Sequence, residues 1–392
     1  MKDFLGKEYA SSTFNRCCHQ RLMGIKGPPL ELHIDENCPH KPALTPAPVP
    51  LHWQEEVKRK LEEGVALGVY ERVPYGTICK YCHRMVVTRK ADGGPRCTVD
   101  MSSLNKATIR ETHHVEPPFK QARSVPPNTL KTVTDAWNGF NSLPLRAEDV
   151  GKTTFITPFG KFRCLMAPQG CAASGDGYAR RFDEIISDIP RKTKCVDDTL
   201  QWDDREDMEG HWWRVIDFLD RCGQNGIVLN FDKFQFSQPA VEFAGFNITE
   251  TEVKPLDKYL KAIAEYPTPS KTTDIRAWFG LVNQVSHYNQ LTQLMLPFKP
   301  FLSKHKKFEW SDEMDRIFEQ SKVAIIDAIK EGVRIYDITK PTCLRLDWSN
   351  TGIGYFLSQK HCSCNSSVPG CCVGGWRITL AGSRFLKPAE SR

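Results

Sequence analysis

Two adjacent carboxylates, Asp197 and Asp198, interrupt a short segment of strand-like composition, with apolar pairs at 195–196 and 199–200. Neighbouring side chains of a regular strand point to opposite faces. The two carboxylates can therefore serve one site only if the chain turns there, as at the tip of a β-hairpin. Two such carboxylates, joined by a third from elsewhere, can hold a pair of Mg²⁺ ions for phosphoryl or nucleotidyl transfer.

A second pair, Asp203-Asp204, shows how little weight this motif has alone. It lies in the polar run at 202–207, which we interpret as a solvated loop leading into a helix. Most aspartates are exposed surface residues, so an isolated pair is usually not a site. The case for catalysis depends on the rest of the chain.

The composition indicates a folded protein of two to four structural units: 392 residues, of which 40% are hydrophobic and 26% charged. No apolar run approaches the roughly 20 residues that span a bilayer, and the N-terminus does not resemble a signal peptide. We therefore expect an intracellular protein, in the cytoplasm or nucleus, with no membrane partner. The net charge of +6 permits nucleic-acid binding without requiring it. Fifteen cysteines without a disulfide framework favour reduced thiols.

The order of elements predicts a split β-α-β sheet with antiparallel pairing. After an irregular start, the pattern predicts a helix from Trp53, a β-hairpin about 92–94 and a strand closing at Asp135. A hairpin at 154–165 and a helix stopped by Pro190 follow. The hairpin of the two aspartates comes next, then an amphipathic helix at Trp212 and strands up to Phe246. Helices at 259–266 and 273–287, a helix capped by Ser311 and three strands after residue 342 follow.

Several motifs are specific in combination. They are Val99-Asp100 with Leu104-Asn105, Asp135 with Gly139-Phe140 and Leu143-Pro144-Leu145, Pro168-Gln169-Gly170, the aspartate pair, Phe243-Ala244-Gly245-Phe246, Pro267-Thr268-Pro269, and Asp347-Trp348-Ser349 with Gly352-Ile353-Gly354. From about Thr45 onward, this order resembles the reverse transcriptase of gypsy-type LTR retrotransposons, a part of the pol polyprotein, with the start of the ribonuclease H domain that follows it.

The resemblance implies an α+β right-hand polymerase with fingers, a palm built on a split β-α-β antiparallel sheet, and a helical thumb, followed by an incomplete ribonuclease H-like α/β domain. The implied domains are an irregular lead-in at 1–45, fingers and palm at 46–250, a thumb at 251–306 and a truncated ribonuclease H-like domain at 307–392. The implied activity is an RNA-directed DNA polymerase. Its partners would be an RNA template, a DNA primer/template and deoxynucleoside triphosphates, and its cofactor Mg²⁺ or Mn²⁺.

The resemblance also assigns the catalytic site. Asp135 and Asp197, with Asp198 assisting, would coordinate two Mg²⁺ ions. One ion would activate the primer 3′-hydroxyl and the other would neutralise the triphosphate.

Nucleotide binding is implied at three positions in the fingers and palm. Arg96, with Lys90 or Arg89, would clamp the phosphates of the incoming nucleotide. Phe140 would lie against the sugar, where its ring excludes a 2′-hydroxyl.

Two further motifs would bind nucleotide and primer. Gln169 and Gly170 would line the nucleotide pocket and the templating base, with the glycine permitting close backbone approach. Phe243, Gly245 and Phe246 resemble the primer grip.

Some residues depart from the family or leave alternatives open. Cys195 replaces the usual aromatic residue before Val-Asp-Asp, with no loss of a metal ligand. Lys233 is either a solvated charge or an acid that protonates the leaving pyrophosphate. His361 begins a cluster with Cys362, Cys364, Cys371 and Cys372 whose spacing is not that of a standard zinc ribbon, and zinc binding stays open.

The ribonuclease H-like segment is the largest departure. Asp347 matches the first metal-binding carboxylate of that domain, as a vestigial metal ligand. The family's next catalytic acid lies beyond the segment at 388–390, so we expect ribonuclease H activity to be absent through truncation.

Two alternatives to an active enzyme of this type remain. One is a non-catalytic, nucleic-acid-binding relic of a retroelement polyprotein, favoured by the truncation and disfavoured by the three intact aspartates. The other is the polymerase of a non-LTR element, disfavoured by the ribonuclease H-like segment directly after the thumb.

Overall fold

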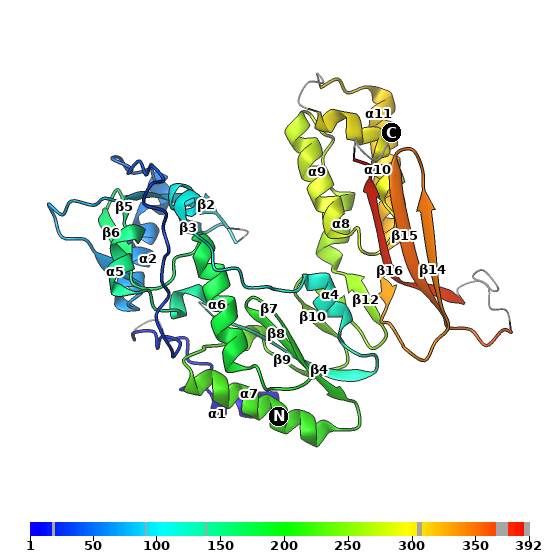
Figure 1. The fold of residues 1–392 in the computed structure, drawn as a ribbon, viewed down its shortest axis with the longest axis horizontal. Coiled ribbons are helices and arrows are strands. Elements are labelled where there is room, and N and C mark those ends of the chain that lie inside the picture. Colours follow the sequence, from blue (N-terminus) through cyan, green and yellow to red (C-terminus); the bar gives the residue numbers. More distant parts are fainter. Residues whose placement is uncertain (18–19, 91, 138, 304–307, 366–374, 388–392) are drawn as a thin grey trace. The chain divides into compact units, whose positions relative to one another are not determined.

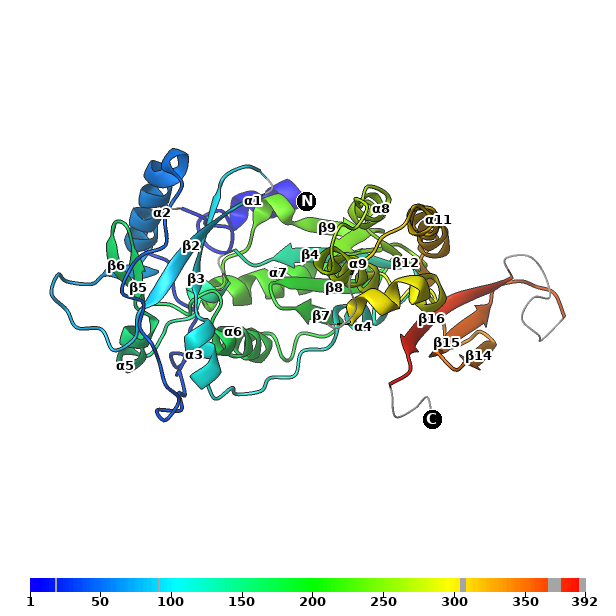
Figure 2. The ribbon, with the colours of Figure 1, turned by 90° about the horizontal axis from the view of Figure 1, so that it is seen from above.

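The computed structural model describes residues 1–17, 20–90, 92–137, 139–303, 308–365 and 375–387, drawn in Figures 1 and 2. The chain forms two compact units. Unit 1 comprises residues 1–115, 133–201 and 209–236, and unit 2 comprises residues 116–132, 202–208 and 237–392. None of the helices within the described residues has the length and apolar character to span a bilayer.

Unit 1 contains a five-stranded sheet with the order β1-β6-β5-β2-β3. Its strands are β1 (Tyr70–Arg72), β2 (His83–Arg89), β3 (Pro95–Asp100), β5 (Phe155–Thr157) and β6 (Gly160–Cys164). The helices near these strands in the chain are α2 (Gln54–Ala66), α3 (Ser102–Ala107) and α5 (Ala147–Val150), and the 3-10 turns are η1 (Leu51–Trp53) and η3 (Gly151–Thr153). Val57 and Leu61, four residues apart on α2, pack on Phe155 and Phe162. The hairpin expected about 92–94 is confirmed.

A second sheet has the order β7-β8-β4-β9 and carries the aspartate pair. Its strands are β4 (Thr129–Asp135), β7 (Lys192–Cys195), β8 (Asp198–Asp204) and β9 (Gln235–Gln238). α6 (Ala172–Ile185) and α7 (Met208–Gln224) contribute Tyr178, Phe182, Phe218 and Leu219 to the buried core of unit 1. Figures 1 and 2 show α7 beneath this sheet. The remaining short turns are η2 (Phe140–Ser142) and η4 (Phe231–Lys233).

The start of the chain differs from the irregular lead-in that we expected. Residues 2–8 form α1 (Lys2–Glu8), and Leu5 is fully buried in the core. The Tyr9 hydroxyl donates to Asp220 at 2.6 Å, and the Leu229 amide donates to the Thr13 carbonyl at 2.7 Å. Local sequence does not reveal this helix, because two turns are too short to show a periodicity and its burial depends on distant residues.

Unit 2 combines a small sheet with helices. The sheet has the order β10-β11-β12-β13, formed by β10 (Val241–Phe243), β11 (Phe246–Ile248), β12 (Glu252–Pro255) and β13 (Val333–Arg334). The helices are α4 (Pro118–Arg123), α8 (Asp257–Ala264), α9 (Thr272–Gln284), α10 (Thr292–Met295), η5 (Leu296–Leu302) and α11 (Asp312–Ile329). Ser311 caps α11 by accepting from the Met314 amide at 3.3 Å, as expected. Trp278 of α9 and Phe318 of α11 are fully buried and pack edge to face between the two helices.

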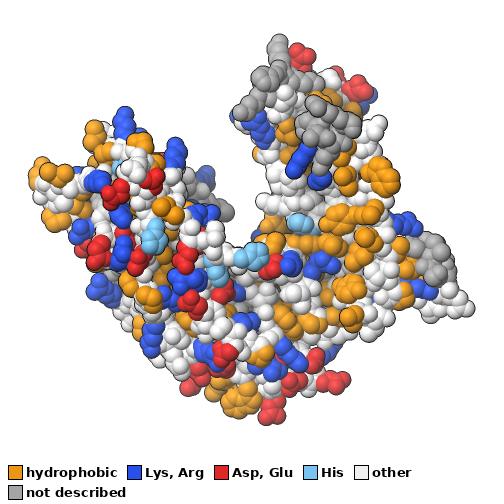
Figure 3. Space-filling view, in the orientation of Figure 1, with side chains coloured by type: hydrophobic (Ala, Val, Ile, Leu, Met, Phe, Trp, Pro, Cys, Tyr) orange, Lys and Arg blue, Asp and Glu red, His pale blue; other side chains and the backbone are white. Residues whose placement is uncertain are grey.

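A three-stranded antiparallel sheet, β14 (Thr342–Trp348), β15 (Gly352–Lys360) and β16 (Trp376–Phe385), completes unit 2 and confirms the three expected strands. Leu344, Leu346 and Trp348 alternate along β14 and therefore share one face, yet all three are exposed. Figure 3 shows hydrophobic side chains gathered where Figure 1 draws these strands. This face is an unusually apolar surface for an isolated sheet.

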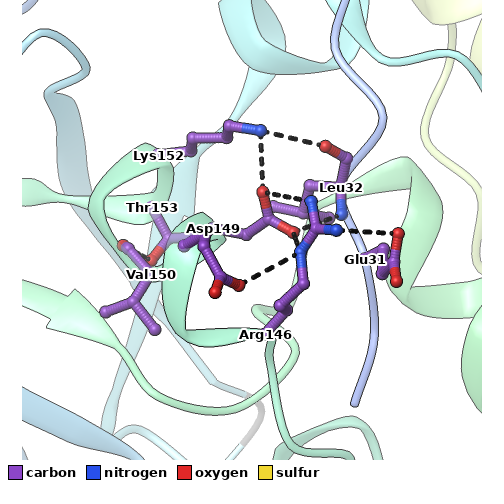
Figure 4. A network of polar contacts seen from close by, with 8 residues as sticks. Glu31, Leu32, Arg146, Asp149, Val150, Lys152 and Thr153 are labelled. Atoms are coloured by element: carbon purple, nitrogen blue, oxygen red, sulfur yellow. Dashed lines mark hydrogen bonds and ion pairs between the residues drawn. The ribbon is translucent and has the colours of Figure 1, made fainter. Parts of the chain in front are cut away.

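A buried carboxylate fastens α5 to the early part of the chain (Figure 4). Asp149 is fully buried and accepts from the Leu32 amide at 2.9 Å, Lys152 Nζ at 2.7 Å and Arg146 Nε at 3.0 Å. Burial alone would raise the pKa of Asp149, but the hydrogen bonds from Lys152, Leu32 and Arg146 outweigh it and hold the pKa below its usual value. The network therefore stabilises the fold while Asp149 is ionised.

Asp149→Asn should lower the free energy of unfolding by about 3 kcal/mol at pH 7, because two cations lose their buried partner. A depressed pKa gives stability that is present above the ordinary carboxyl pKa and lost as the pH falls through the folded-state value. The difference from the wild type should therefore shrink below about pH 4. Urea unfolding at several pH values measures this difference in stability.

Glu148→Gln, at an exposed neighbour on the same helix, is the control and should lower the free energy of unfolding by less than about 0.5 kcal/mol. Equal losses in the two variants would contradict this role.

Candidate active site at the β7–β8 turn

The aspartate pair lies at a tight turn, as the sequence predicts. β7 and β8 pair antiparallel up to Cys195 and Asp198, which leaves Val196 and Asp197 as the two turn residues. Val196 has a φ of +55°, a conformation that β-branched residues rarely adopt and that costs roughly 1–3 kcal/mol. Packing of its side chain against the core of unit 1 holds it there. The turn places Asp197 at the tip and Asp198 at the start of β8.

Asp135 reaches the same place from the end of β4. The Ala136 amide donates to the Asp197 carbonyl at 2.9 Å, and the Asn230 amide donates to the Asp135 carbonyl at 2.8 Å. These backbone bonds bring the third carboxylate to the turn from 62 residues upstream. The structure therefore gathers Asp135, Asp197 and Asp198, the three residues that the sequence proposed as catalytic.

The electrostatics show how closely the three carboxylates interact. Burial raises the pKa of Asp198 to about 6, and the charge and hydrogen bonding of Asp135 add to the rise. Burial, then the charge of Asp135, also raises the pKa of Asp197. The ammonium groups of Lys194 and Lys233 oppose the rise at Asp197. Burial and the neighbouring carboxylates therefore make ionisation of Asp197 and Asp198 less favourable than in water.

One oxygen of Asp197 has an unusual environment. Oδ1 is buried, and neither it nor the Tyr178 hydroxyl makes a hydrogen bond of ordinary geometry within the described residues, although the two groups interact closely enough for the hydroxyl to lower the pKa of Asp197. A Cβ at Gly139 would lie 2.4 Å from this oxygen and 2.9 Å from the Tyr178 hydroxyl. Gly139 therefore leaves the room that the Asp197 carboxylate occupies, and Tyr178 forms the wall behind it.

This donor set fits a divalent cation, although it does not form a finished site. Within the described part of the chain, no three His, Cys, Asp or Glu side chains stand close enough together to hold a metal ion. Asp135 interacts with both of the other carboxylates, by charge with Asp197 and by charge and hydrogen bonding with Asp198. A buried carboxylate oxygen without a hydrogen bond of ordinary geometry in the described residues, beside two further carboxylates, suits the hard, oxygen-preferring cations Mg²⁺ and Mn²⁺.

The second pair of aspartates lies in a different environment from the one we expected. β8 continues through Asp203 and Asp204, and Asp203 is fully buried. The interpretation as a solvated loop is therefore wrong. The polar composition of residues 202–207 does not predict a strand, because cross-strand pairing, rather than local composition, extends β8 to this point.

The fingers residues lie on the β2–β3 hairpin. Lys90 follows β2, Arg96 lies in β3 opposite Thr88, and both are exposed. The turn between them is closed by Gly93, with a φ of +88°, and by the Asp92 carboxylate, which accepts from the Gly94 amide at 2.9 Å. Two exposed cations on a short hairpin are free to contact an anionic ligand.

Gln169 and Gly170 are exposed in the loop before α6. Asn105 fixes this loop: its side-chain amide donates to the Gly170 carbonyl at 2.7 Å, and its oxygen accepts from the Ala172 amide at 2.8 Å. Gly170 has a φ of +92°, which favours glycine. The Leu104-Asn105 motif is thus joined to the Pro168-Gln169-Gly170 motif by direct contact.

Phe140 is linked to the carboxylates through one aromatic neighbour. Its half-buried ring meets the ring of Tyr178 edge to face, with centroids 5.4 Å apart. The sequence predicts a helix over this segment but contains no local signal that Tyr178 lies beside Asp197.

The residues compared with a primer grip lie in unit 2. Phe243 and Phe246 pair across a two-residue turn in which Ala244 and Gly245 have φ values of +48° and +91°. Both phenylalanine side chains are buried, so the hairpin presents backbone at its tip. Asp347 also lies in unit 2, exposed on β14.

The expected cysteine cluster is only partly described. The Sγ atoms of Cys362 and Cys364 are 3.3 Å apart, whereas Cys371 and Cys372 lie outside the described residues. Zinc binding there stays an open hypothesis.

Comparison with known proteins places this geometry in context. Residues 88–248 match the family model described as "Reverse transcriptase (RNA-dependent DNA polymerase)". The matched segment includes Asp135, Asp197 and Asp198. The Transposon Tf2-7 and Tf2-3 polyproteins of Schizosaccharomyces pombe are each 23% identical to it over 358 residues, covering 91% of this chain and 26% of the relative. The chain thus spans about a quarter of the length of these curated relatives.

Solved structures share the fold of the reverse transcriptase domain and its continuation. The foamy viral protease-reverse transcriptase dRH in complex with ds DNA superposes with a TM-score of 0.81 at 16% identity, covering 99% of this chain and 65% of that chain. The foamy viral protease-reverse transcriptase in complex with RNA/DNA hybrid gives 0.80 at 16% identity, covering 99% and 50%. The expected α+β right-hand polymerase fold, followed by a further domain, is confirmed.

Gly139→Ala should lower primer extension by more than about 10-fold, because the new Cβ forces Asp197 away from its position. Because Gly139 is buried and its new Cβ would also approach the Tyr178 ring, the rate is compared at a temperature at which circular dichroism shows the variant to be folded. Gly175→Ala on α6, where a Cβ meets nothing within 4 Å, is the matched control and should keep full activity. Full activity in Gly139→Ala would show that Asp197 does not need this position.

Asp198→Asn should stabilise the metal-free protein at pH 8 by roughly 1–3 kcal/mol. A carboxyl whose folded-state pKa is raised to about 6 costs stability once it is ionised, and this cost vanishes as the pH falls toward the unfolded-state value near 4. The advantage of the variant should therefore be full above pH 6 and absent near pH 4. Urea unfolding with EDTA present at pH 4, 6 and 8 measures it. A variant less stable than the wild type at pH 8 would contradict the repulsion.

Proposed function

We propose that the chain is the RNA-directed DNA polymerase core of an LTR retrotransposon. It extends a primer on an RNA or DNA template with deoxynucleoside triphosphates, in the presence of Mg²⁺ or Mn²⁺. The observation that carries the proposal is the cluster of Asp135, Asp197 and Asp198, held together by backbone bonds although the charges repel. A protein that used these residues only for folding would gain stability by losing one of them.

Each of the three carboxylates has a separate task. Asp135 and Asp197 hold the two ions, and Asp198 adds charge and orients Asp135. When bound, two divalent ions activate the 3′-hydroxyl of the primer and neutralise the charge of the triphosphate. Gly139 and Tyr178 keep the Asp197 carboxylate in position from behind.

The nucleotide is held by residues of the fingers and the adjoining loop. Lys90 and Arg96 bind its phosphates, for which their exposure on the hairpin is suitable. Phe140 lies against the sugar and rejects a 2′-hydroxyl, and Gln169 and Gly170 line the pocket of the base. The contacts of Asn105 keep that loop in place.

The template and primer are bound over the rest of the chain. Phe243, Gly245 and Phe246 grip the primer through backbone at the hairpin tip. The proposed divisions are a lead-in at 1–45, fingers and palm at 46–250, a thumb at 251–306 and a ribonuclease H-like domain at 307–392, in which Asp347 is a residual metal ligand. Two of the similar solved structures are described as complexes with ds DNA and with RNA/DNA hybrid, which supports nucleic acid as the partner.

Primer extension on poly(rA)–oligo(dT) with Mg²⁺ or Mn²⁺ tests the proposal. The wild type should incorporate dTTP, and Asp197→Asn should lose at least about 100-fold of that rate because it removes a metal ligand. Asp204→Asn, an exposed aspartate further along the same strand, is the control and should keep the activity.

Two results would overturn the proposal. One is the absence of incorporation by a folded wild-type protein, and the other is incorporation that Asp197→Asn leaves unchanged. A folded protein that binds the primer–template but never extends it would be the non-catalytic relic instead.

A further inference from the structure

A lysine contacts the carboxylate cluster directly. Nζ of Lys233 lies 3.0 Å from Oδ2 of Asp135, and the two side chains are 62% and 17% exposed. The ammonium therefore approaches the cluster from the solvent side and binds a carboxylate that is itself partly exposed. Lys233 is thus not merely a solvated charge.

The backbone that carries this lysine is fixed relative to Asp135. The Asn230 amide donates to the Asp135 carbonyl at 2.8 Å, and the Asn230 side chain caps η4 by accepting from the Asp232 amide at 3.2 Å. Arg16 donates to Asn230 Oδ1 at 2.6 Å and to Asp232 Oδ2 at 2.9 Å. Because the loop is held from both sides, only the exposed Lys233 side chain can turn toward or away from Asp135.

The charges at the cluster explain why a cation is needed there. The Ala136 amide bonds to the Asp197 carbonyl and Asp198 begins β8, so three carboxylates are brought to the place where the Lys233 ammonium binds Asp135. An ammonium neutralises one charge but cannot bridge several carboxylates as a divalent ion does. It leaves Oδ1 of Asp197 without a hydrogen bond of ordinary geometry within the described residues. Lys233 therefore satisfies the cluster only in part.

We propose that Lys233 is a resident counter-cation of this cluster, bound to Asp135 in the metal-free protein and displaced from it when a divalent cation enters. The inference rests on the metal-dependent function proposed above. The lysine neutralises part of the charge of the cluster before the ion arrives, and it sets the concentration of ion at which the site fills. It is a positioning residue, since it acts through Asp135.

Direct titration of Mn²⁺ alone, followed by electron paramagnetic resonance of the free ion, tests the proposal without nucleic acid or nucleotide. Lys233→Met should bind Mn²⁺ roughly 3- to 10-fold more tightly than the wild type, because the ion no longer competes with or repels an ammonium. Lys233→Gln should behave alike, and Lys233→Arg, which keeps the charge, should stay within about twofold of the wild type.

Lys120→Met is the matched control. Lys120 is 69% exposed and pairs with Glu116 at 2.7 Å. The Lys120→Met variant therefore loses a comparable surface ion pair that does not involve the cluster. Its Mn²⁺ affinity should equal that of the wild type.

Thermal unfolding in EDTA gives a second readout. Lys233→Met should melt at a lower temperature than the wild type, and saturating Mn²⁺ should raise the melting temperature of the variant by more than that of the wild type.

Neutral variants that bind Mn²⁺ with unchanged or weaker affinity would overturn the inference while leaving the polymerase proposal standing. A folded wild type that binds no Mn²⁺ would overturn both. If Asp197→Asn abolishes primer extension while Lys233→Met leaves Mn²⁺ binding unaltered, the polymerase proposal stands and only the counter-cation role of Lys233 is rejected.

Discussion

Repulsion among three carboxylates, brought together in a partly buried place, is the constraint on which the rest of unit 1 depends. Asp197 stands on a two-residue turn whose other residue, Val196, has an unfavourable backbone conformation. Asp135 is tied to that turn by the bond between the Ala136 amide and the Asp197 carbonyl. Such an arrangement persists only where packing and strand pairing overcome its cost.

The core of unit 1 provides that compensation. α6 and α7 bury their apolar faces on the sheet that carries the turn, and Tyr178 and Phe182 are fully buried. Polar contacts then fix the loops around the site: Asn105 holds the segment at 168–172, and the network of Asp149 holds α5. The scaffold is thus rigid where it supports the carboxylates, and the charged side chains of Lys90, Arg96 and Lys233 are left exposed.

Unit 2 uses its apolar surface differently. Its helices enclose Trp278 and Phe318, and the β10–β11 hairpin turns its phenylalanine side chains inward. The β14–β16 sheet instead keeps Leu344, Leu346 and Trp348 in solvent. An apolar sheet face of this kind normally contacts another surface, and it is the part of the chain most prone to association.

Local patterns determined much of this protein by themselves. The hairpin at the aspartate pair, the turn at 92–94, the Ser311 cap and the order of strands and helices all follow from periodicity and turn chemistry within a few residues. Only the tertiary structure decided that Asp203 is buried in a strand, that α1 packs on the core, that Tyr178 stands behind Asp197 and that Lys233 binds Asp135. Those contacts join residues that are far apart in the chain, such as the 98 positions between Lys233 and Asp135. Local sequence patterns describe which face of an element is apolar, whereas packing selects the side chains that meet across elements.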